Sequence, residues 1–171
     1  MYKRITSLLL ILVSLSIFGQ EENIDKLKFD TYDFPKAVVI DVENKNQASL
    51  KKKVEAWIES YFTERTLNKS SFSKNTFSIS AQSERFLKVK NLPSDLNFEI
   101  KISLRDNKYR FEVTNLNYKY YTEYRQISDV NLIKDEVIKK DLDQSRSLLS
   151  TFFNNLNSDL YQFIISENTD W

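Results

Sequence analysis

The alternation of apolar and polar residues between positions 97 and 114 constrains the fold more than any other feature of the sequence. Apolar side chains occupy every second position in two segments, which Asp106-Asn107 separates. A two-residue turn at this point needs positive φ values, which Asp and Asn tolerate, and it pairs Leu104 with Tyr109. The same register pairs Ile102 with Phe111, Ile100 with Val113, and Lys101 with Glu112. One face of the hairpin is therefore apolar, which predicts an antiparallel sheet covered on one side only.

Two segments with helical periodicity can cover the apolar face. The first is predicted over residues 47–65, with an apolar stripe made of Leu50, Val54, Trp57, Ile58, Tyr61 and Phe62. The second is predicted to begin at Asp141, which forms a capping box with Gln144, and to end near Ser166. Its apolar residues are Leu142, Leu149, Phe152, Phe153, Leu156, Leu160, Phe163 and Ile164. We expect both stripes, including Trp57, to form the core.

Three further segments have the composition of strands: residues 37–42, 76–82 and 86–90. A loop at Ser83-Glu84-Arg85 is expected to join the last two, because it places Leu87 opposite Ala81 and keeps the apolar side chains on one face. Residues 126–140 have no clear pattern. The resulting order, β-α-β-β-β-β-α, predicts a two-layer α+β fold with both helices on one face of one antiparallel sheet.

The first 20 residues have the features of a cleavable signal peptide. Lys3 and Arg4 precede an apolar run that is shorter than the about 20 residues needed to span a bilayer. Cleavage is expected after Gly19 or Gln20. We therefore expect export to the periplasm or the extracellular space, with no integral membrane segment left after cleavage. Because the chain has no Cys, it has no site for a lipid-modified cysteine anchor.

The remaining sequence is predicted to contain one domain. An extended lead-in is expected over residues 21–35, a single α+β domain over 36–167, and a C-terminal tail over 168–171. Removal of the signal shortens the chain from 171 to 151 residues, which suits a single domain.

The composition of the exported part excludes several kinds of chemistry. The one glycine, Gly19, lies in the signal, so no glycine-rich phosphate loop is possible. The chain has no His and no Cys, which excludes a Ser-His-Asp triad and a thiol nucleophile. We expect no cofactor, no metal and no catalytic residues. Loss of Lys3 and Arg4 lowers the basic residues from 25 to 23 against 24 acidic ones, and this net charge of −1 argues against a nucleic-acid partner.

The order of elements resembles that of an uncharacterised family of small exported bacterial domains with a TBP-like fold. The resemblance runs from about Ala37 to Ile165. It rests on the strand before the Trp57 helix, on residues 101–110 with the aromatic continuation Phe111, and on the closing amphipathic helix. The resemblance implies the same topology, TBP-like or helix-grip-like, and no established activity. The fold label does not imply binding to DNA.

A tyrosine-rich segment is the best candidate for a contact surface. It consists of Tyr118, Tyr120, Tyr121, Tyr124 and Arg125. Tyr and Arg are favoured at the centres of protein interfaces. The alternative is that these rings cover a sheet edge or the last helix.

Two basic features are weaker candidates for binding. Lys51, Lys52 and Lys53 lie near the start of the first predicted helix, where helical N–H groups can bind an anion. The alternative is a solvated face balanced by nearby glutamates. Arg110 projects from the polar face of the hairpin and could bind a carboxylate through two hydrogen bonds, or it could belong to a cross-strand charge network.

These features favour a non-catalytic binding or interaction module of the bacterial envelope. Its partner is expected to be a protein, a glycan or a small amphiphile. The alternative is a small hydrolase that uses Asp, Glu, Ser, Tyr or Lys. That alternative requires a concave pocket containing a carboxyl group of raised pKa.

Overall fold

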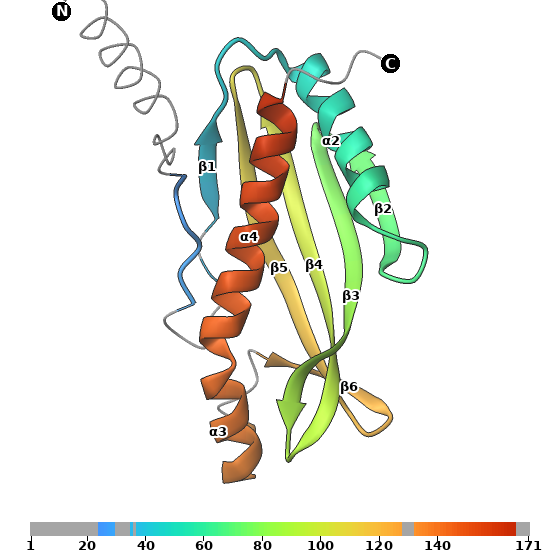
Figure 1. Ribbon diagram of the computed structural model, residues 1–171, viewed down its shortest axis with the longest axis vertical. Coiled ribbons are helices and arrows are strands. Elements are labelled where there is room, and N and C mark those ends of the chain that lie inside the picture. Colours follow the sequence, from blue (N-terminus) through green and yellow to red (C-terminus); the bar gives the residue numbers. More distant parts are fainter. Residues whose placement is uncertain (1–23, 30–34, 36, 128–131, 167–171) are drawn as a thin grey trace, which may run out of the picture.

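One antiparallel sheet with helices on a single face forms the body of the molecule (Figure 1). The computed structural model describes residues 24–29, 35, 37–127 and 132–166. Within these residues, the strands are β1 (Val38–Asp41), β2 (Leu67–Ser73), β3 (Thr76–Val89), β4 (Leu92–Arg105), β5 (Lys108–Tyr120) and β6 (Glu123–Gln126). The helices are α2 (Gln47–Tyr61), α3 (Glu136–Gln144) and α4 (Arg146–Ile165). The predicted two-layer α+β class is confirmed, although individual elements differ from the prediction.

The strand order is β1-β5-β4-β3-β2, and β6 pairs with the end of β5. The central hairpin of β4 and β5 has the predicted register, with Leu104 opposite Tyr109 and Ile102 opposite Phe111. In its turn Asn107 has a φ of 59°, whereas Asp106 stays outside the positive region, so only one of the two turn residues is left-handed. The alternating pattern thus determined the pairing correctly without determining the turn geometry.

The predicted loop at residues 83–85 is wrong, because β3 continues through it. A β-bulge lies between Ser83 and Leu87, where Arg85 has a φ of 53°. The bulge places two extra residues in β3, an even number that preserves the alternation, so Leu87 points to the same buried face as Ala81 without a reversal of the chain. Strand β3 therefore pairs along its length with β4, and Ala81 lies opposite Phe98.

Strand β2 has no apolar alternation and was not predicted from the sequence. It pairs with β3 at the edge of the sheet, across a turn in which Lys74 and Asn75 have φ values of 48° and 63°. The β3–β4 turn is similar, with φ values of 50° at Lys90 and 63° at Asn91. Positive φ at both central residues is the requirement of a type I′ hairpin, here met without glycine.

The helix boundaries also differ from the prediction. Helix α2 begins after Asn46, whose side chain accepts a hydrogen bond from the Ser49 N–H, and it ends at Tyr61. The predicted start at Asp141 is wrong: Asp135 caps α3 at its N-terminus, and Asp141 lies inside that helix. Asp141 instead accepts a hydrogen bond from the Lys90 backbone N–H at 2.8 Å. The single predicted C-terminal helix is therefore two helices that meet at Ser145.

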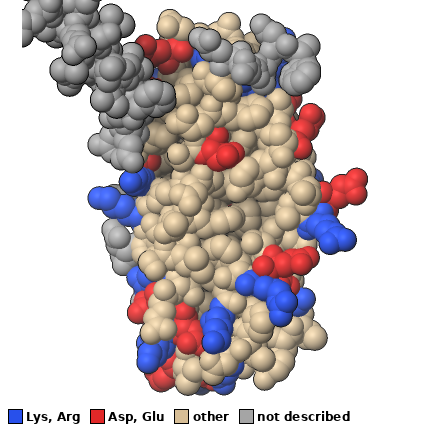
Figure 2. All heavy atoms as spheres, in the orientation of Figure 1, with Lys and Arg blue, Asp and Glu red and all other residues tan. Residues whose placement is uncertain are grey.

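The core lies between the sheet and the helices. Leu50, Val54 and Trp57 of α2 are fully buried, as are Phe153 and Leu160 of α4. Figure 2 shows the helix-bearing face, where most charged groups lie toward the margins and the centre is largely uncharged. The opposite face of the sheet carries the polar members of each alternating strand, and we call it the open face.

Residues 24–29 lack regular secondary structure but pack against the core. Leu27 is buried, and the Phe29 ring stacks on Phe153 at a centroid separation of 5.7 Å. The predicted signal peptide over residues 1–20 and the predicted tail over 168–171 lie outside the described residues. No helix in the described part of the chain has the length and apolar character needed to cross a bilayer.

Candidate functional site

The predicted tyrosine surface is divided between the two faces of the sheet. In the β5–β6 hairpin, Tyr118 lies opposite Arg125, and Lys119 lies opposite Tyr124. Successive side chains of a strand point to opposite faces. Tyr118 and Arg125 therefore face the helix side, as does Tyr120, while Tyr124 and Lys119 face the open side. The segment does not form one continuous contact surface, which corrects the interpretation based on the sequence.

Tyr118 is fully buried and cannot belong to an exposed contact surface. It lies between Leu96 of β4 and Arg125 of β6 in the register of the sheet. The Arg125 guanidinium is 5.1 Å from the centre of the Tyr120 ring. Its hydrogen bond to Glu123 raises the pKa of Arg125, and Tyr118 contributes in the same direction. On the helix side, the cluster therefore combines the buried Tyr118 with an exposed cation that lies against the Tyr120 ring.

Tyr121 is the most exposed tyrosine of the cluster, with 72% of its surface accessible. It has a φ of 55° at the β5–β6 turn, and its ring lies 4.6 Å from that of Tyr120. The left-handed region costs a non-glycine residue about 1–2 kcal/mol, and a bulky side chain there is unusual. The fold therefore holds an aromatic ring in solvent at a position that Gly or Asn would occupy with less strain.

A hollow of about 280 Å³ lies beside Tyr121. We call it the distal hollow, because it lies at the end of the sheet where β3 turns into β4 and β5 into β6. Its lining residues are Val89, Leu92, Pro93, Ser94, Asp95, Lys119, Tyr120 and Tyr121. The hollow thus combines apolar and aromatic walls with one acidic and one basic side chain.

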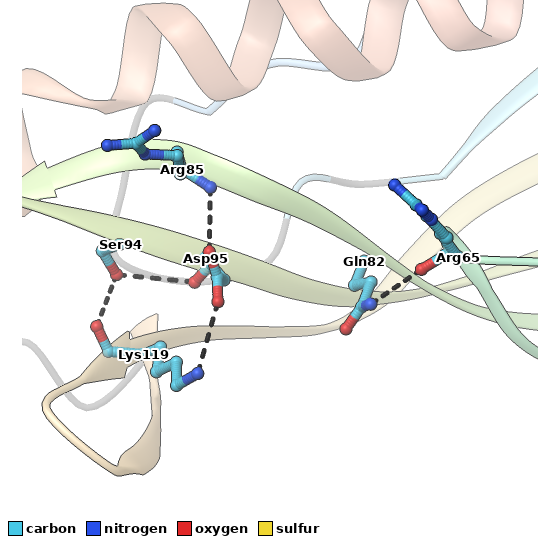
Figure 3. Close-up of polar contacts among 6 residues, drawn as sticks. All are labelled: Arg65, Gln82, Arg85, Ser94, Asp95 and Lys119. Carbon is cyan, nitrogen blue, oxygen red and sulfur yellow. Dashed lines mark hydrogen bonds and ion pairs between the residues drawn. The ribbon is translucent and has the colours of Figure 1, made fainter.

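Asp95 holds the three strands together at the edge of the distal hollow (Figure 3). Its Oδ1 accepts the backbone N–H of Arg85 at 2.9 Å, which satisfies a group exposed by the bulge in β3. Its Oδ2 lies 3.5 Å from the Lys119 ammonium group on β5. The neighbouring Ser94 is buried and donates to the Lys119 carbonyl at 2.6 Å. Sequence reasoning missed these residues, because nothing local pairs Asp95 with a lysine 24 positions away.

The three lysines of α2 point to different partners. Lys51 forms an ion pair with Glu55 at 3.2 Å and lies 5.0 Å from the centre of the Phe72 ring. Lys53 donates to the carbonyl of Ser166, just beyond the end of α4, at 2.8 Å. Lys52 is exposed. The lysines do not converge on one point, and anion binding by them stays a prediction.

The N–H groups at the start of α2 are also engaged. Gln47 donates its backbone N–H to Asp106 at 2.7 Å, and Ser49 donates to Asn46 at 2.8 Å. The bond to Asp106 connects the helix to the β4–β5 turn, and the bond to Asn46 caps the helix locally. Both bonds occupy backbone donors that an anion at this end of the helix would need.

Arg110 occupies the predicted position on the open face. It lies opposite Ser103 on one side and Val39 of β1 on the other. Its guanidinium pairs with Glu112 of the same strand at 3.1 Å. This pair lies within one strand, so a cross-strand charge network and the binding of an external carboxylate both stay predictions. Among the described residues, no group of three or more acidic side chains is arranged to hold a metal ion.

Solved structures with this arrangement define the class of fold as TBP-like. A TBP-like protein from Parabacteroides distasonis ATCC 8503 aligns with a TM-score of 0.56 and 19% identity over 75% of this chain and 90% of that one. A DUF4468 family protein from Bacteroides ovatus ATCC 8483 aligns with a TM-score of 0.59 and 12% identity over 87% and 94% of the two chains. At these identities the similarity establishes the fold alone.

Residues 37–119 match the family model described as a domain of unknown function (DUF4468) with TBP-like fold. The chain therefore contains a DUF4468 domain, which confirms the resemblance noted in the sequence. The match ends at Lys119, before the exposed tyrosines of the β5–β6 hairpin. No curated protein matches the chain.

Proposed function

We propose that this protein is an exported, non-catalytic binding module of the bacterial envelope, with its contact region at the distal hollow. The observation that carries the proposal is the position of Tyr121. Its ring is largely exposed at a turn residue with a φ of 55°, and it stands at the wall of the hollow. Strained backbone conformations often mark functional sites. Tyr side chains also supply large contact areas at low cost in conformational entropy.

The hydrolase alternative receives no support from the distal hollow. Asp95 is the carboxylate of its lining, and both of its oxygens are engaged in holding strands together. Tyr120 and Tyr121 also line the hollow, and the interactions of the Asp95 side chain are with Arg85 and Lys119. The hollow thus has the composition of a contact site rather than that of an acid-base site.

Substitution of Tyr121 tests the proposed contact region. Tyr121→Asn removes the ring and retains a residue that tolerates positive φ, so the hairpin should fold at least as well as in the wild type. Immobilised wild-type protein is incubated with envelope extract, and retained components are quantified by mass spectrometry. We expect a specific component to be lost with Tyr121→Asn. Its retention at the wild-type level by this variant would overturn the proposed contact region.

A matched control uses the same replacement at the other end of the sheet. Lys74 also has positive φ, in the β2–β3 turn, and lies beside Thr76, which pairs with Ser103 far from the hollow. Lys74→Asn should therefore leave the captured component unchanged.

Export is tested separately from binding. Cells producing the full chain are fractionated, and the N-terminus of the protein in the envelope and medium fractions is sequenced. We expect a new N-terminus after Gly19 or Gln20. An intact chain found only in the cytoplasm would contradict the export proposal.

A further inference from the structure

The open face carries a row of four amide side chains that crosses four strands. Gln82 of β3 lies opposite Asn97 of β4, Asn97 lies opposite Asn117 of β5, and Asn117 lies opposite Gln126 of β6. All four residues are partly buried, and we call them the amide row. Neighbouring strands are about 4.8 Å apart, so three steps between strands extend over about 14 Å. No local sequence pattern connects these residues, because each comes from a different strand.

One polar atom of the amide row is left without a partner. Within the described residues, the Oδ1 atom of Asn97 is buried and accepts no hydrogen bond. A buried acceptor without a donor costs about 1–3 kcal/mol. The side chain as a whole is partly exposed, and the terminal torsion of Asn is broad, so a small rotation presents this oxygen to a donor on the surface.

The other amides of the row are only partly used. The Gln82 Nε2 donates to the Arg65 carbonyl at 2.7 Å (Figure 3), and the Asn117 Nδ2 donates to Asn115 at 3.2 Å. Each amide side chain has an acceptor oxygen and two N–H donors. Gln82 and Asn117 therefore each have a further side-chain N–H group and an acceptor oxygen that can bind a ligand with both donors and acceptors.

An aromatic ring lies beside the row on the same face. Tyr124 precedes Gln126 by two residues on β6, which places the two side chains about 7 Å apart on one face. It is 43% exposed, and the Lys119 ammonium lies 5.9 Å from its ring centre. A sugar ring has hydroxyl groups at its edge and C–H groups on its faces. Amides and an adjacent exposed aromatic ring match these two chemistries.

The charge of the surface favours a neutral ligand. The amide row has no charged member, and the charges next to it, Asp95 and Lys119, are paired with each other. Glu99 lies two residues from Asn97 on the same face and disfavours a polyanion there, whereas Glu112 further along is paired with Arg110. An extended peptide usually adds its backbone to the edge of a sheet. The amide row instead lies on the face of the sheet, over its paired strands.

We propose that the amide row and Tyr124 form a binding site for a neutral oligosaccharide that lies across strands β3 to β6. This inference rests on the proposed binding function and assigns it a class of ligand. It uses the open face, whereas the proposed contact at Tyr121 uses the distal hollow.

The test is an NMR titration of the 15N-labelled full chain with neutral hexasaccharides of glucose and of mannose. Side-chain NH₂ signals of Asn and Gln report directly on the amide row. We expect at least one hexasaccharide to shift signals of Asn97 and Asn117. Asn117→Ala and Tyr124→Ala should each weaken its binding about tenfold, which corresponds to about 1.4 kcal/mol. Lys101→Ala, on the same face beyond the Glu99 row, is the control and should bind as the wild type.

Two outcomes would overturn the inference. One is the absence of shifts in the amide row with every neutral hexasaccharide at millimolar concentration. The other is binding only to acidic oligosaccharides or to neutral extended peptides, which are titrated in parallel. Capture that depends on Tyr121 together with no sugar binding would remove this inference and leave the proposed function intact. Conversely, if sugar binds the amide row but no captured component depends on Tyr121, the inference stands and the proposed contact region at Tyr121 is wrong.

Discussion

The side-chain amide of Asn154 binds both backbone hydrogen-bonding groups of Leu27. The Leu27 N–H donates to Oδ1 at 2.8 Å, and Nδ2 donates to the Leu27 carbonyl at 3.0 Å. The Leu27 side chain is buried in the core at the same point. One residue of α4 thus fixes a segment that lies 127 positions earlier in the chain. Residues 24–29 of the predicted lead-in are therefore held against the folded domain through Leu27.

Asn154→Ala should lower the free energy of unfolding by about 1–3 kcal/mol, because it leaves two backbone groups of Leu27 without their partner. Urea denaturation followed by circular dichroism measures this loss. Asn155→Ala is the control, because Asn155 is an exposed neighbour on the same helix. Faster amide hydrogen exchange at Leu27 should accompany the loss in the first variant. Equal stability of the two variants would show that the two hydrogen bonds between Asn154 and Leu27 do not contribute to stability.

Tyr109→Phe should destabilise the core through the loss of one hydrogen bond. The buried Tyr109 hydroxyl donates to Asn157 Oδ1 at 2.9 Å, and Asn157 is 1% exposed. Removing the hydroxyl leaves a buried acceptor, at a cost of about 1–3 kcal/mol. The double variant Tyr109→Phe/Asn157→Leu should lose less than the sum of the single losses, since the orphaned acceptor is also removed. Strict additivity in urea denaturation would contradict this coupling.

The pKa of the Tyr109 hydroxyl is raised well above its usual range, chiefly by burial. Its ionisation is therefore coupled to unfolding. In an alkaline titration followed by absorbance, Tyr109 should titrate only as the protein unfolds. Titration of every tyrosine before unfolding would contradict the burial of Tyr109.

Two substitutions at Asp95 separate its two interactions. Asp95→Asn keeps an oxygen for the Arg85 N–H and removes the charge opposite Lys119, a partly exposed pair, so the expected loss is at most about 1 kcal/mol. Asp95→Ala removes both interactions and should cost about 1–3 kcal/mol, because the bulge N–H loses its acceptor. Urea denaturation compares the two variants. Equal losses would mean that the ion pair dominates.

The Asp135–Lys90 pair should make stability depend on pH at both extremes. The hydrogen bond with Lys90 is the largest cause of the lowered pKa of Asp135, and the same bond raises the pKa of Lys90. The Asp135 contribution is complete above the ordinary value of 3.8 and is lost as the pH falls through the lowered folded-state value. The Lys90 contribution is complete below 10.5 and is lost as the pH rises through the raised value.

Asp135→Asn is the variant for this prediction, since Asn also caps a helix but carries no charge. Its difference in unfolding free energy from the wild type should be present at neutral pH and vanish in strong acid. Glu136→Gln, one residue further along, is the control. A difference that is constant across the acid range would contradict the assignment to Asp135.

The predictable part of the fold came from patterns within single segments. The register of the β4–β5 hairpin followed from alternation around Asp106-Asn107, and the burial of Trp57 followed from helical spacing. The bulge in β3 was not predictable in this way. The apolar pattern on either side of residues 83–87 is the same whether these residues form a loop or a bulge. Only the pairing of β3 with β4 distinguishes the two. Strand β2 was not predictable from its sequence, because an exposed edge strand needs no apolar alternation.

The candidate site was predictable as a segment but not as a surface. The sequence pointed to the tyrosines around residue 120, and Tyr121 and Tyr124 are exposed. Tyr118 is buried and takes no part in the exposed surface. Asp95 of β4 belongs to the site through its ion pair with Lys119, and the sequence did not indicate this pairing. The distal hollow and the amide row consist of residues from several strands, so neither leaves a signal in any one segment.

The sequence by itself determined the two-layer α+β class, the central hairpin and most of the core, because strand and helix periodicities express which side chains must leave water. Only the tertiary structure decided which face of the sheet each tyrosine occupies. It also decided which residue accepts the hydrogen bond of the Arg85 N–H in the bulge, and which residue binds the backbone of Leu27. These features depend on contacts between residues that are distant in the chain. Their energies come from pairing and burial across strands and helices, and no local pattern of residue types encodes such contacts.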